Sequence, residues 1–260
     1  MTSQIAAQLY TVREHTQTLD DLARTCQRIR AIGYEAVETA TLGPHDAESL
    51  AKILREHGLT CVCTHADVAA MKEIARCADY HAALDCAFTA IGGFGFGGCE
   101  LEAWQGFIDE YNSAAAGLQE TGIRIGYHNH YQEWLRLDDG SRPIDLLLKD
   151  LHPAVWIELD TYWVAHAGGE PTTWLRRVQD SETDGLSRLP CVHFKDMQMD
   201  GEGNRIMCEV GTGNLDWPGI IGACRDAGTR WHIVERDHGT LDPFESLKIS
   251  LEQLKKMGLE

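Results

Sequence analysis

The sequence has little positive charge for its length and no long apolar run. Its 260 residues include 23 lysines and arginines against 40 aspartates and glutamates, a formal net charge of -17. That charge repels phosphate backbones and anionic lipids at long range, so nucleic acids and membranes are not expected partners. No segment approaches the ~18 apolar residues of a membrane span, and the N-terminus lacks the pattern of an export signal. We therefore expect a soluble, cytoplasmic protein.

Two common types of motif are also missing. None of the nine cysteines stands in C-x-x-C spacing, and most lie singly in apolar segments, which is typical of core residues in a reducing compartment. No G-x-G-x-x-G turn follows the first apolar run, which argues against a doubly wound dinucleotide-binding fold. The segment GGFGFGG (92–98) lacks that spacing, and we expect it to be a flexible loop whose Phe94 and Phe96 cover a bound ligand.

What the sequence does contain is a series of short apolar runs separated by segments of helical periodicity. Residues 18–33 place Leu22, Cys26 and Ile29 on one stripe and end at Gly33, and residues 46–58 begin at the capping residue Asp46. The runs span residues 5–12, 36–40, 60–65, 88–93, 123–130, 155–160, 191–196 and 231–237. Eight strands that alternate with helices over about 250 residues predict an α/β fold, the parallel (β/α)8 TIM barrel. We expect one domain over residues 1–260.

Polar residues stand at the ends of the predicted strands, where a parallel barrel gathers its active site. They are His65, Asp67, His128, His130, Glu133, Glu158, Asp160, His193, Lys195, Asp196, Glu235 and Asp237. A group of four among them, from neighbouring strands, offers two nitrogens and two oxygens: His128, Asp160, His193 and Glu235. That donor set suits Mn²⁺, Fe²⁺, Co²⁺ or Zn²⁺ better than Ca²⁺ or Mg²⁺. The alternative is a rim of hydrogen-bonded side chains without a metal.

The motifs around these residues resemble the xylose isomerase-like TIM-barrel superfamily, particularly the sugar phosphate isomerases/epimerases. They extend over nearly the whole chain: QLYTVRE, GYEAVE, YHNHYQEW, IELDTYWVAHAGGEP, VHFKDM, EVGTGNLDW and IVERD. In that superfamily one divalent ion is held by a glutamate, an aspartate, a histidine and a glutamate on strands five to eight. The resemblance implies Asp160, His193 and Glu235 as ligands, His128 in place of the first glutamate, and Mn²⁺ as the expected ion.

Two departures from the superfamily pattern bear on the reaction. Ketose epimerases of the superfamily exchange protons on opposite faces of the substrate through the glutamates of strands five and eight. An imidazole at His128 therefore argues against symmetric epimerisation and favours a one-sided reaction, such as β-elimination or an aldose–ketose shift. Trp163 is the second departure, because epimerases tend to have a histidine there.

The remaining site predictions concern substrate and proton transfer. Glu235 and Lys195 are the predicted catalytic residues, although Lys195 could instead be a rim lysine paired with Asp196 or Glu235. The predicted substrate-binding residues are His65, His130, Glu133 and Trp163, with a supporting role behind the site as the alternative for His130 and Glu133.

These features together predict a divalent-metal-dependent sugar, keto-sugar or polyol isomerase, epimerase or lyase that works through an enediolate-type intermediate. Its expected partner is a small carbohydrate, and the sequence leaves homo-oligomerisation open. Two alternatives remain. One is a non-catalytic sugar-binding barrel or partner subunit, and the other is a nuclease like the abasic-site endonucleases, which need three metals and a basic surface.

Overall fold

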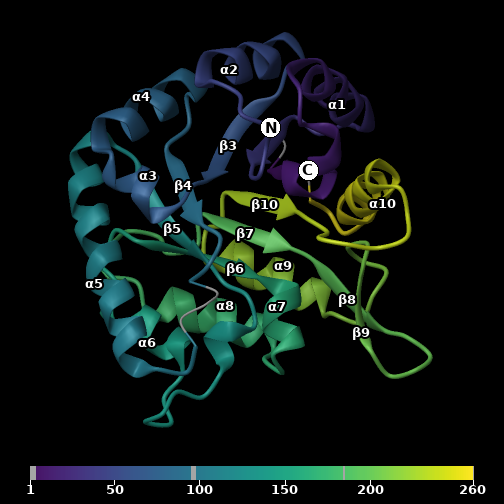
Figure 1. Ribbon diagram of the computed structural model, residues 1–260. Helices are drawn as coiled ribbons and strands as arrows, with labels where there is room; N and C mark the ends of the chain where they lie inside the picture. The colour runs from purple at the N-terminus through teal and green to yellow at the C-terminus, as the bar shows by residue number, and fades with distance from the viewer. Residues whose placement is uncertain (1–3, 95–97, 184, 260) are drawn as a thin grey trace.

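The computed structural model describes residues 4–94, 98–183 and 185–259, and within them the eight predicted strands close into a parallel barrel (Figure 1). The strands are β1 (Ile5–Gln8), β2 (Ala36–Thr39), β3 (Thr60–His65), β4 (Phe88–Ile91), β5 (Arg124–His128), β6 (Trp156–Asp160), β7 (Cys191–Phe194) and β10 (Trp231–Val234). They are ordered β1-β10-β7-β6-β5-β4-β3-β2, and β2 pairs back to β1. The predicted TIM barrel is confirmed.

Helices surround the barrel (Figure 1). In α1 (Leu19–Ile32) the Thr18 side chain accepts a hydrogen bond from the backbone of Asp21, and Gly33 ends the helix at a φ of 118°, which glycine adopts without strain. The cap predicted at Asp46 is confirmed for α2 (Ala47–Glu56). The other long helices are α4 (Ile74–Leu84), α5 (Leu101–Leu118), α6 (Pro143–Asp150), α8 (Pro171–Asp180), α9 (Trp217–Asp226) and α10 (Pro243–Lys256). No helix in the described ranges is both long and apolar enough to span a membrane.

Short helical segments directly follow several strands and shape the rim above them. They are η1 (Leu9–His15) after β1, α3 (Val68–Lys72) after β3, η3 (Gln132–Trp134) after β5 and α7 (Thr161–His166) after β6; η2 (Gln119–Thr121) instead precedes β5. The strand ends and the residues that follow them are therefore held by ordered backbone.

An antiparallel hairpin of β8 (Asp196–Met199) and β9 (Arg205–Cys208) lies outside the barrel and was not expected from the sequence pattern (Figure 1). Asp196 anchors the segment that follows it. Its carboxylate accepts hydrogen bonds from the backbone of Gly211 and Gly213 and from Trp217 Nε1. A buried carboxylate that satisfies three donors stabilises the connection from β7 to α9.

A cluster of buried apolar side chains is formed by residues of the barrel strands. Its buried side chains come from seven strands: Ala6, Ala36, Val62, Cys63, Ala90, Trp156, Cys191 and Ile233. The Trp156 ring is fully buried and occupies the space beside Gly126 of β5, where a Cβ atom would lie 2.3 Å from the ring. All nine cysteines are free and only Cys99 is exposed, which agrees with their predicted use as core residues.

The contact between Gly126 and Trp156 makes a stability prediction. Gly126→Ala is expected to lower the free energy of unfolding by about 1–3 kcal/mol, because the ring cannot move without repacking the barrel centre. Gly106→Ala is the control: this exposed glycine in α5 has open space around it, so the change should stabilise by about 0.5–1 kcal/mol. Urea denaturation measures both. If the two variants change the free energy of unfolding by the same amount in the same direction, the close contact between Gly126 and Trp156 is contradicted.

A buried histidine outside the site predicts how stability depends on pH. His232 of β10 is 3% exposed, and its ring centroid lies 5.0 Å from that of Phe194. Burial and, to a smaller extent, the charge of Arg225 lower the pKa of His232 from 6.5 to about 4. The unfolded chain binds this proton more readily, so the stabilisation is complete above pH 6.5 and is lost as the pH falls to about 4.

The expected loss from this one group is about 3 kcal/mol across that interval. His232→Gln should therefore flatten the fall in unfolding free energy between pH 6.5 and pH 4, measured by urea denaturation at several pH values. Parallel curves for the two proteins would show that His232 has the same pKa in the folded and the unfolded chain.

Candidate active site

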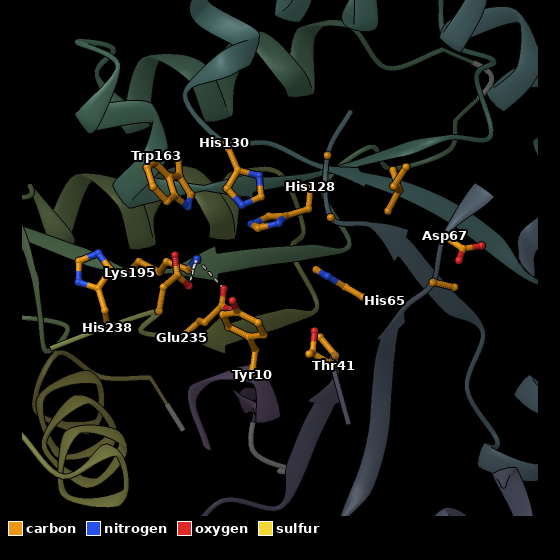
Figure 2. Close-up of a pocket in the computed structure, with 16 residues that line it drawn as sticks. Tyr10, Thr41, His65, Asp67, His128, His130, Trp163, Lys195, Glu235 and His238 are labelled. Atoms are coloured by element: carbon orange, nitrogen blue, oxygen red, sulfur yellow. Dashed lines mark hydrogen bonds and ion pairs between the residues drawn. The ribbon is translucent and has the colours of Figure 1, made fainter. Parts of the chain in front are cut away.

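A cavity of about 580 Å³ opens where the strands have their C-terminal ends (Figure 2). Six of the predicted site residues line it, namely His65, His128, His130, Trp163, Lys195 and Glu235, together with Tyr10, Thr41, Asp67, Asp237, His238 and smaller residues. In Figure 2, His128, His130 and Trp163 lie along one side, and Tyr10, Glu235 and Thr41 lie along the other. The cavity is thus bounded by imidazoles and an indole on one side and by oxygen-bearing side chains on the other.

The four residues predicted as metal ligands meet at the floor of this cavity. One ligand atom from each of His128, Asp160, His193 and Glu235 lies within 4.8 Å of all the others. His128 Nε2 lies 3.1 Å from Asp160 Oδ2, and His193 Nδ1 lies 2.9 Å from Glu235 Oε2. The last two atoms are buried and make no hydrogen bond of good geometry. Together with His128 Nε2 and Asp160 Oδ2 they form a buried set of two nitrogens and two oxygens, which fits a divalent transition-metal ion.

Asp160 is oriented by its place at a strand end. It is the last residue of β6 and the N-cap of α7, and its Oδ1 accepts a hydrogen bond from the backbone of Trp163 at 2.9 Å. Its own backbone N–H donates to Asn129 Oδ1 at 3.1 Å. Because Oδ1 caps the helix, Oδ2 is left to face His128 and the centre of the group.

Lys195 is a buried cation beside this group. Its Nζ lies 3.0 Å from Asp160 Oδ2, 2.7 Å from Glu235 Oε2 and 2.8 Å from Asp237 Oδ1. Burial alone would lower the pKa of Lys195, but these carboxylates outweigh it and hold the pKa well above its usual range. Pairing of Lys195 with Glu235 is confirmed. Pairing with Asp196 is wrong, because that carboxylate is engaged by the backbone that leads into α9.

A second group of buried residues lies on the other side of the His193 ring. Its central member, Glu38, was not among the predicted site residues. His193 Nε2 lies 2.6 Å from Glu38 Oε2, while His65 Nε2 lies 2.8 Å from Glu158 Oε2 and 3.4 Å from Glu38 Oε1. Both glutamates are fully buried. Burial, with the charge of Glu38, raises the pKa of Glu158 to about 7. A glutamate inside the buried strand of GYEAVE was the signal that could have revealed Glu38.

Glu133 does not reach the cavity. It is fully buried, its Oε1 accepts a hydrogen bond from Tyr127 Oη at 2.5 Å, and its Oε2 accepts one from the backbone of His130 at 2.8 Å. Of its two predicted roles, this geometry favours support of His130 over direct contact with a substrate.

Phe94, which we expect to cover a bound ligand, does not line the cavity in this structure. Its ring stacks on Phe107 of α5 with centroids 4.5 Å apart and meets Trp104 edge-on. An apolar ring gains more by packing against these aromatic residues than by standing over a polar cavity. Phe96 lies outside the described residues.

The family model for the xylose isomerase-like TIM barrel matches residues 26–257. The chain belongs to this family. A curated relative, the inosose dehydratase of Erwinia tasmaniensis, is 23% identical over 161 residues, which are 55% of this chain and 52% of that protein. The match therefore spans about half the length of the relative.

Solved structures with the same fold include a sugar phosphate isomerase/epimerase from Parabacteroides distasonis, with a TM-score of 0.81, 20% identity, and coverage of 100% of this chain and 96% of that chain. The D-allulose 3-epimerase from a Methylomonas species has a TM-score of 0.71 at 17% identity and covers 98% of each chain. The resemblance inferred from the sequence motifs is confirmed.

Proposed function

We propose that this protein is a divalent-metal-dependent enzyme that removes a proton from the carbon next to the carbonyl group of a sugar, a keto-sugar or a polyol that carries a carbonyl. The observation that carries the proposal is the convergence of His128, Asp160, His193 and Glu235 at the floor of an open cavity. Mn²⁺ is the proposed ion, with Zn²⁺, Co²⁺ or Fe²⁺ as alternatives. When bound, such an ion polarises the carbonyl oxygen and stabilises the negative charge that develops as the proton leaves.

Glu235 is the proposed base and Lys195 the proposed acid. Burial would raise the pKa of Glu235, but Lys195 and His193 outweigh it and hold that pKa well below its usual range. Glu235 is therefore ionised at neutral pH and can accept a proton from a substrate carbon. The Lys195 ammonium, 2.7 Å from this carboxylate, can donate a hydrogen bond or a proton to a substrate oxygen.

His128 supports a reaction on one face of the substrate. It stands where the ketose epimerases of the superfamily carry a second glutamate. Burial and the neighbouring His193 hold its pKa well below the usual range, so its imidazole is neutral and suited to metal binding. We therefore favour an elimination of water or an aldose–ketose shift over a symmetric epimerisation. The named relatives include both a dehydratase and an epimerase.

The proposed substrate contacts are His65, His130 and Trp163, all of which line the cavity. A large aromatic surface beside polar groups suits the apolar face and hydroxyl groups of a sugar. The net charge of -17 and the carboxylates around Lys195 argue against a nucleic acid as substrate.

The experiment that tests this function is incubation with Mn²⁺ in D₂O and a panel of ketoses, keto-sugars and inososes. We expect metal-dependent loss of water or isomerisation, with solvent deuterium entering at the carbon next to the carbonyl, detected by NMR. Chelator-treated protein is the control. Sugar binding without any exchange or product would instead favour the non-catalytic sugar-binding barrel.

A further inference from the structure

The two nitrogens of His193 face different groups of carboxylates. Nδ1 lies 2.9 Å from Glu235 Oε2 and 3.9 Å from Asp160 Oδ2, which are atoms of the proposed metal centre. Nε2 points away from that centre and lies 2.6 Å from Glu38 Oε2. Because a histidine binds a metal ion through one nitrogen, the partner of the other nitrogen decides which one is free to do so.

Glu38 is itself held in a fixed position. Its Oε2 also accepts a hydrogen bond from Gln8 Nε2 at 2.7 Å, and Gln8 Oε1 in turn accepts one from the backbone of Tyr10 at 3.1 Å. Glu38 and Gln8 are fully buried and do not line the cavity, whereas Tyr10 does. A chain of hydrogen bonds therefore runs from the cavity wall to the far side of the His193 ring.

We infer that Glu38 is a positioning residue that makes His193 a metal ligand through Nδ1. Its carboxylate accepts the Nε2–H of His193, so the proton on Nδ1 is the one that a metal ion would displace, and the hydrogen bond increases the basicity of Nδ1. Glu38 does not line the cavity, and apart from His193 the proposed site residue that it contacts is His65, whose Nε2 lies 3.4 Å from its Oε1. This inference rests on the proposed function, because it requires a metal ion at the centre.

Two variants separate the charge of Glu38 from its hydrogen bond. Glu38→Gln retains an acceptor at the same place but removes the charge, so we expect Mn²⁺ to bind about 10-fold more weakly. Glu38→Leu removes the acceptor as well, and the expected loss is about 100-fold. Glu133→Gln is the control: this carboxylate is equally buried but does not contact His193, so Mn²⁺ affinity should stay within about 2-fold of wild type. Isothermal titration calorimetry measures all four proteins.

The spectroscopic readout is the His193 ring in Zn²⁺-loaded protein, followed by ¹⁵N NMR. We expect a protonated Nε2 whose proton resonance lies far downfield and moves upfield in Glu38→Gln. This isosteric variant and the wild-type spectrum keep the test decisive even if Glu38→Leu does not fold.

Three outcomes would overturn the inference, each in a different way. If the wild-type protein binds Mn²⁺ and neither Glu38 variant binds it more weakly, Glu38 has no positioning role, but the proposed function is not contradicted. Two Mn²⁺ ions per wild-type chain, reduced to one in Glu38→Leu, would make Glu38 a ligand of a second ion instead. A wild-type protein that binds no divalent metal contradicts the proposed function itself.

Discussion

Replacing Asp160 with alanine is expected to abolish stoichiometric metal binding and, with it, turnover. The substitution removes one of the four proposed ligands, so the loss of affinity should exceed the roughly 100-fold that a supporting residue costs. It also removes the hydrogen bond that Oδ1 accepts from the backbone N–H of Trp163, a helix cap worth about 1 kcal/mol, and one of the three ion pairs of Lys195. Lys195 keeps Glu235 and Asp237 as partners, so the barrel should stay folded. Metal analysis after dialysis and circular dichroism measure the two effects separately.

The matched control is Asp237→Asn, on the same rim. Asp237 also pairs with Lys195, at 2.8 Å, but it is not among the four converging residues, so the variant should retain its metal. His193→Ala should behave like Asp160→Ala, while His128→Glu should lose less because a ligand atom is kept. Full metal occupancy in either alanine variant would refute the ligand assignment.

Lys195→Met is expected to destabilise the metal-free protein by about 3–5 kcal/mol, because breaking a buried ion pair leaves uncompensated charge. Asp160, Glu235 and Asp237 all lie within 3.0 Å of the Lys195 ammonium. Mn²⁺ should restore much of this stability by neutralising Asp160 and Glu235. The increase in melting temperature on adding Mn²⁺ should therefore be larger for the variant than for the wild type.

Lys72→Met is the control for the lost charge. Lys72 forms an ion pair of 2.9 Å with Glu110, but both side chains are about half exposed, so its removal should change stability by less than about 1 kcal/mol. Two results would mean that the rim carboxylates do not act as one charged group. One is an equal loss of stability in the two lysine variants, and the other is a melting temperature of Lys195→Met that does not change when Mn²⁺ is added.

The sequence predicted the barrel well because the signals for it are local. Each strand is a short apolar run between helices with clear stripes and caps, and parallel topology brings the strand ends together whatever the loops do. For that reason His128, Asp160, His193 and Glu235, which are far apart in the chain, could be grouped from their positions alone.

What the sequence did not reveal depends on contacts that no local pattern records. Glu38 gains its role from His193, 155 positions away in the chain. Phe94 packs against α5, and the Glu133 carboxylate accepts a hydrogen bond from Tyr127. Both residues are close in sequence to residues that line the cavity, yet neither lines it. The β8–β9 hairpin lies outside the strand and helix alternation on which the barrel prediction was based.

The most direct test of the central claim is the metal content of wild-type protein purified without chelator, measured by inductively coupled plasma mass spectrometry. We expect one transition-metal ion per chain, most of it Mn²⁺ when the medium supplies it, and a lower melting temperature once that ion is removed. Protein with no stoichiometric transition metal, and with a melting temperature that added Mn²⁺ leaves unchanged, would contradict the claim.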